Sequence, residues 1–277
     1  MGLEVIGVLH LPPLPYVGLR PAQSLEEVIE RAVSEARVLE EAGFTAVLVE
    51  NFGDAPYRKR VRDPLALASM AVVVREVVRG TSLAVGVNIL RNSGLEAYSV
   101  AVAAGARFIR VNALSEVVVS DSGLLEPEAP RLRAVRANYP WVRVYADVLV
   151  KHGGSLSLIA QRAAGELKSL ALDDVVREVV LDYVERGRAD ALVVTGGRTG
   201  EPPPTELLKA VRRYSPVPVV VGSGATPENV GELLRYSDGV IVGSYIRRDG
   251  RAGNPVDAER AKRFVEAVRS AGGDLGA

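Results

Sequence analysis

Residues 217–227 read VPVVVGSGATP, a run of strand-forming residues that leads through glycines into the start of a helix. Residues 217–221 are apolar on both faces, which is typical of a strand that other elements cover on both sides. Thr226 and Pro227 then place an N-cap residue directly before a first-turn proline. A buried strand that passes through a short loop into a helix predicts one unit of a parallel α/β fold.

The same unit recurs along the chain, as short β-branched runs that each precede a polar loop and a helical pattern. The runs are residues 5–11, 46–51, 83–90, 108–113, 142–150, 191–195, 217–221 and 239–242. Eight buried parallel strands that alternate with helices are typical of a closed barrel. The sequence therefore predicts a single (β/α)8 TIM barrel, with residues 1–277 as one domain.

Helix boundaries agree with this architecture. Ser24 and Glu27 form a capping-box pattern at the start of one predicted helix, and Gly43 provides its end. Asp63 and Pro64 combine an N-cap residue with a first-turn proline at the start of the next. Local helix signals thus support the alternation of strands and helices.

Two of the predicted strand-to-helix loops are long, at residues 115–126 and 152–172. The first contains three consecutive valines and is expected to form a hairpin or a lid. The second contains an additional helical pattern at residues 158–167. Such loops lie at the catalytic face of a barrel, where they can cover a ligand, and a contact between subunits is the alternative interpretation.

Composition limits the expected partners and location. The 34 Lys and Arg residues balance 34 Asp and Glu residues, so no overall charge favours nucleic acid or an anionic membrane. No apolar run approaches the roughly 20 residues of a membrane span, no targeting segment is evident, and a cytoplasmic location is expected. The absence of cysteine excludes disulfides and thiolate chemistry. The excess of Arg over Lys is typical of thermophiles, and also of some genome compositions.

Glycine-rich turns after the last three predicted strands indicate an anion site. They contain Gly196 and Gly197, then Gly222, Ser223 and Gly224, then Gly243 and Ser244. Several backbone N–H groups must converge on a phosphate, and this close approach favours residues without Cβ. The last two strands are also the usual location of a phosphate in such barrels. We therefore expect these turns to bind a phosphate, and simple tight turns are the alternative.

Polar residues at the ends of the other predicted strands are expected to face the mouth of the barrel. Those expected to bind substrate are His10, Asn51, Asn88, Asn112 and Thr195. The asparagine amides suit the hydroxyl groups of a ligand because they both donate and accept hydrogen bonds. Alternatively, the asparagines cap the layers of side chains inside the barrel.

The candidates for catalysis are Glu50, Asp147, Lys151 and His152. Asp147 and Lys151 share one side of an extended strand because an even number of positions separates them. A lysine can act as an acid, a base or a Schiff-base amine, and a carboxylate can orient hydroxyls or assist proton transfer; His152 is a candidate proton carrier. The structural alternatives are an Asp147–Lys151 ion pair and a buried Glu50 that pairs with Arg110 or Lys151.

A divalent metal is a further option, because His10, His152, Glu50 and Asp147 are metal-binding residue types. The two histidines belong to the first and fifth predicted strands, on opposite sides of the barrel, so no cofactor is firmly implied. The sequence also contains no P-loop, no strand-linked G-x-G-x-x-G, no H-E-x-x-H and no G-x-S-x-G motif.

Characteristic motifs follow the predicted strands in order. They are HLPPLP at 10–15, VENFGDAP at 49–56, GVNILRN at 86–92, FIRVN at 108–112, ADVLVKH at 146–152, VTGGRTG at 194–200 and GSG at 222–224. Together they resemble those of the BtpA family, from the first strand to the last. The chain departs from the family at Tyr16, Val17 and Gly18, where Gly-Ser-Pro is usual, and at Ser93, where an acidic residue is expected. These departures concern the substrate more than the fold.

The resemblance implies a fold similar to the ribulose-phosphate-binding barrels. The family name refers to photosystem I biogenesis, although similar proteins occur in organisms without photosynthesis. Our first hypothesis is an enzyme that acts on a phosphorylated sugar or nucleotide-like metabolite, as an isomerase, a lyase or a glycosidic transferase. The alternatives are a non-catalytic assembly or stability factor and a regulatory module that binds a metabolite. The expected partner is a phosphorylated small molecule, and a homo-oligomer is compatible with the fold.

Overall fold

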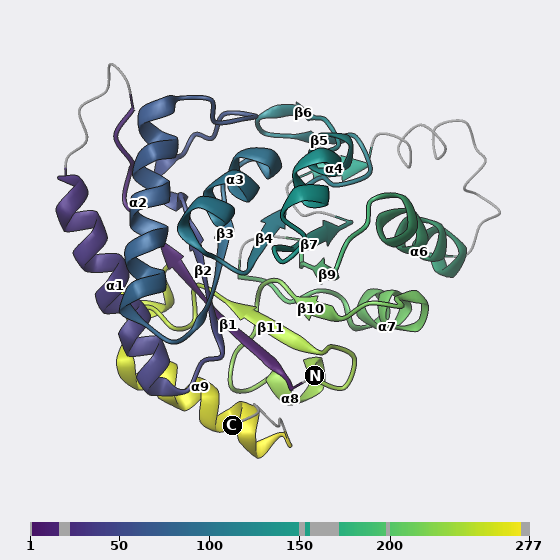
Figure 1. Ribbon diagram of the computed structural model, residues 1–277. Coiled ribbons are helices and arrows are strands. Elements are labelled where there is room, and N and C mark those ends of the chain that lie inside the picture. The colour runs from purple at the N-terminus through teal and green to yellow at the C-terminus, as the bar shows by residue number, and fades with distance from the viewer. Residues whose placement is uncertain (1, 17–22, 150–152, 156–171, 198–199, 273–277) are drawn as a thin grey trace.

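The computed structural model describes residues 2–16, 23–149, 153–155, 172–197 and 200–272. Eight parallel strands close into a barrel in the order β1-β11-β10-β9-β7-β4-β3-β2 (Figure 1). The strands are β1 (Glu4–His10), β2 (Ala46–Glu50), β3 (Ala84–Asn88), β4 (Phe108–Val111), β7 (Arg143–Val148), β9 (Ala191–Val194), β10 (Val219–Val221) and β11 (Gly239–Val242). The predicted barrel is confirmed, and each strand overlaps the run predicted for it.

Helices surround the ring of strands (Figure 1). They are α1 (Leu25–Ala42), α2 (Pro64–Gly80), α3 (Gly94–Ala104), α4 (Ala129–Asn138), α6 (Leu172–Leu181), α7 (Thr205–Tyr214), α8 (Val230–Leu233) and α9 (Ala258–Ser270), with the shorter turns η1 (Phe52–Asp54), η3 (Asp182–Arg186) and η4 (Arg248–Gly250). Apolar residues of the helices and of the strands form one large core cluster. The strands are covered on their outer face, which explains why their sequences do not alternate.

A second apolar cluster fills the inside of the barrel. Within it the rings of Phe108 and Tyr145 stack with centroids 4.7 Å apart. The Tyr145 hydroxyl donates to the carboxylate of Glu4, whose oxygens lie 2.7 and 2.8 Å away. Because the interior is packed with side chains, a ligand site is expected at the ends of the strands.

The register of the strands brings polar strand ends together. His10 of β1 lies opposite Glu50 of β2, and Glu50 lies opposite Asn88 of β3. A slip of one residue between these strands would turn a side chain to the other face of the sheet. The register thus places three residues that are far apart in the sequence side by side at the carboxyl ends of β1, β2 and β3.

Two of the predicted helix starts are confirmed. Ser24 and Glu27 form the complete capping box before α1, and Gly43 ends this helix in the left-handed conformation, with φ of 94°. The Asp63 side chain accepts hydrogen bonds from two first-turn amides of α2, whose first residue is Pro64.

The helix predicted to start at Thr226 and Pro227 begins at Val230, although the amides of Asn229 and Val230 already donate to the Thr226 carbonyl at 3.2 and 3.0 Å. Helix α8 is limited to Val230–Leu233. The Asn229 side chain accepts from the Thr226 amide at 2.8 Å and donates to the Gly224 carbonyl at 2.9 Å. Asparagine side chains often form such local bonds to the backbone at turns and helix starts. The glycine turn after β10 is therefore followed by an asparagine-stabilised turn and not by a long helix.

The loop at residues 115–126 forms a hairpin, one of the two predicted alternatives. Strand β5 (Val118–Ser120) pairs in antiparallel fashion with β6 (Gly123–Leu125), and β8 (Gly153–Ser155) pairs with the other edge of β5. The helical pattern predicted at residues 158–167 lies outside the described residues.

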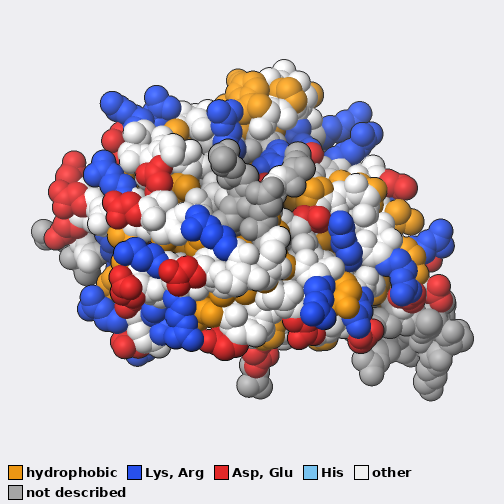
Figure 2. Space-filling view, turned by 90° about the horizontal axis from the view of Figure 1, so that it is seen from below, with side chains coloured by type: hydrophobic (Ala, Val, Ile, Leu, Met, Phe, Trp, Pro, Cys, Tyr) orange, Lys and Arg blue, Asp and Glu red, His pale blue; other side chains and the backbone are white. Residues whose placement is uncertain are grey.

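The surface agrees with the balanced composition. On the face shown in Figure 2, basic and acidic side chains are interspersed. In the described parts of the chain, no helix combines the length and the apolar character that crossing a membrane requires.

Candidate functional site

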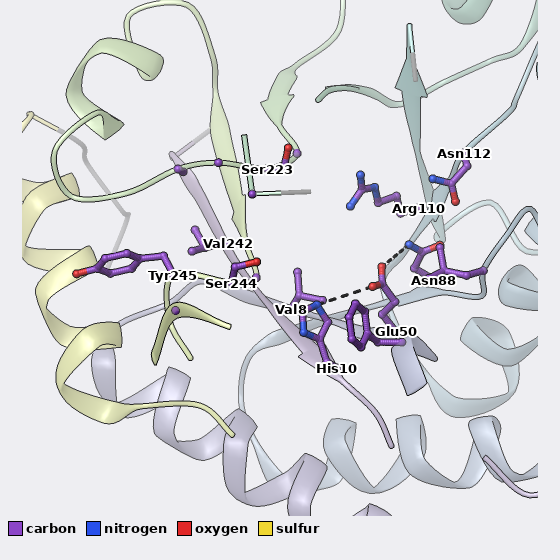
Figure 3. A pocket seen from close by; sticks show the side chains of 18 of the residues that line it. Val8, His10, Glu50, Asn88, Arg110, Asn112, Ser223, Val242, Ser244 and Tyr245 are labelled. Atoms are coloured by element: carbon purple, nitrogen blue, oxygen red, sulfur yellow. Dashed lines mark hydrogen bonds and ion pairs between the residues drawn. The ribbon is translucent and has the colours of Figure 1, made fainter. Parts of the chain in front are cut away.

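A cavity of about 520 Å³ lies at the carboxyl ends of the barrel strands. The predicted site residues that line it are His10, Glu50, Asn88, Asn112, Gly222, Ser223, Gly224, Gly243 and Ser244. Figure 3 shows Glu50, Asn88 and Asn112 on one side of the cavity, and Ser244 and Tyr245 on the other. The fold thus joins the predicted substrate-binding and phosphate-binding residues in one cavity.

Glu50 belongs to the wall formed by β1, β2 and β3. Asn88 Nδ2 donates a hydrogen bond to Glu50 Oε2 at 2.7 Å, and His10 Nε2 lies 3.9 Å from Glu50 Oε1. Glu50 as a residue is 92% buried, yet it lines the cavity. A carboxylate in this position can accept a proton from a bound ligand or return one to it.

His10 is held as a neutral imidazole. Its Nδ1 accepts a hydrogen bond from the Gly253 amide at 3.1 Å, and its ring stacks on Phe52 with centroids 4.2 Å apart. Burial, together with the positive charges of Arg247 and Arg31, lowers the pKa of His10 well below its ordinary value. Because Nδ1 is an acceptor, the proton of the neutral ring lies on Nε2, which is therefore a hydrogen-bond donor.

Asp147 is engaged by two neighbouring side chains. Arg110 donates from Nε and Nη2 to the two carboxylate oxygens at 2.8 and 3.2 Å, and Asn112 Nδ2 donates to Oδ2 at 2.7 Å. Although burial opposes the charge of Arg110, Asp147 raises the pKa of Arg110 above its ordinary value. Asp147 is 1% exposed, whereas Arg110 and Asn112 line the cavity. In this arrangement Asp147 orients two groups that a ligand can touch.

The glycine turns after β10 and β11 meet at the same cavity. At Gly222 and Gly224, neighbouring protein atoms leave no room for a Cβ, so packing requires glycine even without a ligand. A Cβ on Gly222 would lie 2.5 Å from Val193, and one on Gly224 would lie 2.0 Å from the nitrogen of Pro202. At Gly243 a Cβ would lie 3.4 Å from His10, so this glycine leaves room on the cavity side. Packing thus explains two of the glycines, and the space at Gly243 remains for a ligand.

Backbone donors are present in these turns. Among the described residues, no acceptor binds the amides of Ser223, Gly224 and Ala225 after β10, or those of Ser244 and Tyr245 after β11. Amides of this kind are the usual ligands of a phosphate group.

Gly196 and Gly197, in the turn after β9, were predicted to bind phosphate, but neither is among the residues that line the cavity. A Cβ on Gly196 would lie 2.3 Å from the carbonyl oxygen of Glu201, so Gly196 packs against the following loop. Gly197 is exposed, and the Thr195 methyl group packs close to Gly222. From this connection, Gly200 reaches the cavity lining.

Arg260, in the first turn of α9, adds a cation near the glycine turns. It lines the cavity, its guanidinium lies 4.5 Å from the centre of the Tyr245 ring, and its Nε donates to the Tyr245 carbonyl at 2.5 Å. A guanidinium that is held in place by a ring and a carbonyl is well suited to bind an anion.

The β5–β6 hairpin contributes to the lining of the cavity. Arg91 Nη2 lies 2.8 Å from Asp121 at the hairpin tip, and the Arg91 guanidinium lies 4.7 Å from the centre of the Tyr57 ring. Burial and the charge of Glu50 raise the pKa of Tyr57 to about 12. Tyr57, Arg91 and Asp121 all line the cavity, so the hairpin forms part of the site.

Of the remaining predicted residues, the structure describes only Asn51. Lys151 and His152 lie outside the described residues. Asn51 accepts from the Leu90 amide at 2.7 Å and donates to Asp54 at 2.9 Å, so both ends of its amide are used by neighbouring loops. Over the described ranges, no three His, Asp or Glu side chains gather in a way that would hold a metal ion.

Sequence reasoning missed several lining residues, among them Tyr57, Arg91, Asp121, Tyr245 and Arg260. Arg91 lies within the motif at residues 86–92, which is a signal that could have identified it. Asp121 and Arg260 have no such signal, because a hairpin tip and the first turn of the last helix reach the cavity through the tertiary fold.

A model of the BtpA family matches residues 2–270. The chain belongs to the BtpA family. An uncharacterized protein of Thermococcus kodakarensis is 45% identical over 96% of this chain and 95% of its own length. The Photosystem I biogenesis protein BtpA of Synechocystis is 38% identical over 95% of this chain and 87% of its own length.

Solved structures confirm the predicted barrel fold. N-(5'-phosphoribosyl)anthranilate isomerase from Pyrococcus furiosus superimposes with a TM-score of 0.57 over 96% of this BtpA-family chain and 99% of that chain. The two sequences are 15% identical, so the similarity concerns the fold.

Proposed function

We propose that this BtpA-family protein is an enzyme that acts on a phosphorylated sugar or nucleotide-like metabolite in the strand-end cavity. The observation that carries the proposal is the presence of two different chemistries in one cavity. The backbone amides of the glycine turns and Arg260 line the same cavity as Glu50, Asn88, Arg110 and Asn112. The volume of about 520 Å³ is in the range of small-molecule sites.

In this proposal the phosphate binds at Ser223, Gly224, Gly243 and Ser244. A phosphoryl group needs several N–H donors in a concave site, and these turns supply them. The name of the structurally similar phosphoribosyl isomerase contains a phosphorylated sugar, which supports the same class of ligand for this fold.

The reacting part of the metabolite lies toward Glu50. Glu50 acts as the general base or acid, and the Nε2–H of His10 donates to an oxygen of the ligand or to Glu50 itself. Lys151 and His152 are the other candidates for proton or covalent chemistry. Isomerisation, aldol-type cleavage and glycosidic transfer all require such acid–base groups.

The phosphate site is tested by comparing ligands that differ only in phosphorylation. We expect D-ribose 5-phosphate to bind in a calorimetric or thermal-shift titration and D-ribose to bind at least about tenfold more weakly. Gly243→Ala places a methyl group in the cavity and should weaken binding of the phosphate ester about tenfold. Gly231→Ala is the matched control, because its Cβ also meets its nearest atom at 3.4 Å but outside the cavity.

Catalysis is tested by NMR detection of turnover with a panel of pentose and hexose phosphates. Glu50→Gln and Lys151→Ala should retain binding and lose turnover if these residues act on the reacting atoms. Binding without turnover by the wild type would contradict an enzyme and favour a regulatory module.

A non-catalytic assembly factor is a second candidate, because a 38% identical relative is named a photosystem I biogenesis protein. No binding of any sugar phosphate by the wild type would contradict the metabolite site and favour this function.

A further inference from the structure

A second cavity, of about 310 Å³, is formed by the loop that precedes α2 and by strand β6 of the hairpin. None of its described lining residues also lines the strand-end cavity. The lining residues are Lys59, Arg60, Arg62, Asn92, Leu124, Leu125 and Glu126. Three cations and one carboxylate therefore meet in this cavity, although the charges of the whole chain balance.

Two of the three cations are not used by the protein. Within the described parts of the chain, the side chains of Lys59 and Arg62 make no ion pair and no hydrogen bond. Arg60, in contrast, pairs with Glu128, which is fully buried and also binds Arg131. The charge of Arg60 is thus balanced inside the fold, whereas Lys59 and Arg62 can both bind an anion that enters the cavity.

The backbone that carries these cations is bonded to the segment after β3. The Val61 amide donates to Ser93 Oγ at 3.0 Å, and the Lys59 carbonyl accepts from the Asn92 amide at 3.1 Å. A ligand therefore does not have to order this loop when it binds, which lowers the entropic cost of binding.

The other side of the second cavity belongs to the hairpin. A Cβ on Gly123 would lie 2.9 Å from Lys59 Cε and 3.6 Å from Lys59 Nζ, so the lysine lies beside β6. Leu124 is 47% exposed and adds an apolar surface to the lining. Asp121, at the tip of the same hairpin, lines the strand-end cavity. The hairpin thus borders both cavities.

We propose that the second cavity is a regulatory site that binds the phosphate group of a small metabolite. It is called the hairpin site below and comprises Lys59, Arg62 and Glu126. The phosphate contacts both cations, and the Glu126 carboxylate weakens its binding. The bound anion joins the loop to β6 and so holds the hairpin tip at the strand-end cavity. The hairpin site does not depend on the function proposed for that cavity.

An NMR titration of the ¹⁵N-labelled full-length protein with inorganic phosphate tests the hairpin site. The Leu125 amide reports on the hairpin site, and the Gly224 amide reports on the glycine turns in the same samples. We expect a saturable shift of the Leu125 signal. Lys59→Gln combined with Arg62→Gln should weaken binding at Leu125 about tenfold and leave the titration of Gly224 within about twofold of the wild type.

Two further variants separate a local charge effect from damage to the fold. Glu126→Gln removes the opposing carboxylate and should tighten binding at Leu125 about threefold, a gain that a disrupted fold would not produce. Arg133→Gln combined with Arg235→Gln is the matched control, because it removes two exposed arginines that line neither cavity. This control should leave the Leu125 titration within about twofold of the wild type.

Hydrogen exchange tests the regulatory role. Phosphate should slow exchange in residues 118–125 of the wild type but not of the Lys59→Gln, Arg62→Gln variant. No saturable shift at Leu125, or a shift that this variant retains in full, would overturn the hairpin site. A shift at Leu125 without slower exchange would overturn its regulatory role. No shift at Gly224 would count against the proposed function and leave the hairpin site in place.

Discussion

At the scale of single residues, the environment of His10 determines its protonation. The Gly253 amide donates to Nδ1, and burial near the positive Arg247 and Arg31 makes a further positive charge on the ring costly. His10 is therefore a fixed donor at Nε2 and not a proton shuttle with an ordinary pKa.

The stability of the protein should depend on pH through His10. Its pKa in the folded state is lowered from the ordinary value of 6.5. As the pH falls below 6.5, the unfolded chain binds the proton first, so folded-state stability decreases by up to about 1.4 kcal/mol per pH unit. Urea unfolding at pH 7.5 and 5.5 measures this loss. His10→Asn retains an acceptor for the Gly253 amide and should lose less stability than the wild type when the pH falls. Equal losses in the two proteins would show that His10 does not cause the pH dependence.

At the scale of elements, the Asn92 side chain connects the β5–β6 hairpin to the barrel by hydrogen bonds. Its Oδ1 accepts from the Ala113 amide at 2.9 Å, and its Nδ2 donates to the carbonyls of Ala113 and Glu126 at 3.2 and 2.9 Å. These residues flank the hairpin on both sides, so one buried side chain holds its base closed. The hairpin tip then meets Arg91 at the cavity edge.

Asn92→Ala should loosen the hairpin more than the barrel. The substitution leaves buried backbone groups unpaired, at a cost of about 1–3 kcal/mol. Hydrogen exchange followed by mass spectrometry should show faster exchange in residues 118–125, with β1 and β2 protected as in the wild type. Asn138→Ala is the matched control, because the Asn138 amide makes an exposed bond to Ala134. Unchanged exchange in the hairpin would show that Asn92 does not hold it.

At the scale of the whole molecule, a polar contact crosses the inside of the barrel. Tyr145 on β7 donates to Glu4 on β1, and these two strands lie on opposite sides of the closed ring. Burial and Glu4 raise the pKa of Tyr145, so the phenol keeps its proton and remains a donor. The contact involves the first residue of β1, at the end opposite to the cavity.

Tyr145→Phe should therefore reduce global stability without affecting the site. A lost hydrogen bond to a carboxylate costs about 1.5–3 kcal/mol, while the stacking on Phe108 is kept. Chemical denaturation measures the loss, and affinity for D-ribose 5-phosphate should stay within about twofold of the wild type. Tyr139→Phe, at a position that is 40% exposed, is the control and should change stability by less than about 0.5 kcal/mol. A large effect on affinity would show that the Tyr145–Glu4 contact influences the cavity at the other end of the barrel.

The sequence alone determined the barrel and much of one cavity wall. A strand covered on both faces must be apolar, so the places where His10, Glu50 and Asn88 end such runs could be recognised without a structure. Helix caps such as Ser24 were also predictable, because capping depends on residues within one turn. The helix predicted from Thr226 starts at Val230, after a turn in which the Asn229 side chain accepts from the Thr226 amide.

Only the tertiary structure decided which groups pair across the site. Asp147 binds Arg110 and Asn112, and the cavity receives Asp121 from a hairpin and Arg260 from the last helix. These contacts join segments that are distant in the chain, and several partners of suitable charge compete for each group. A local pattern encodes which face of an element is buried, but the choice of partner depends on distances that exist only after the barrel has closed.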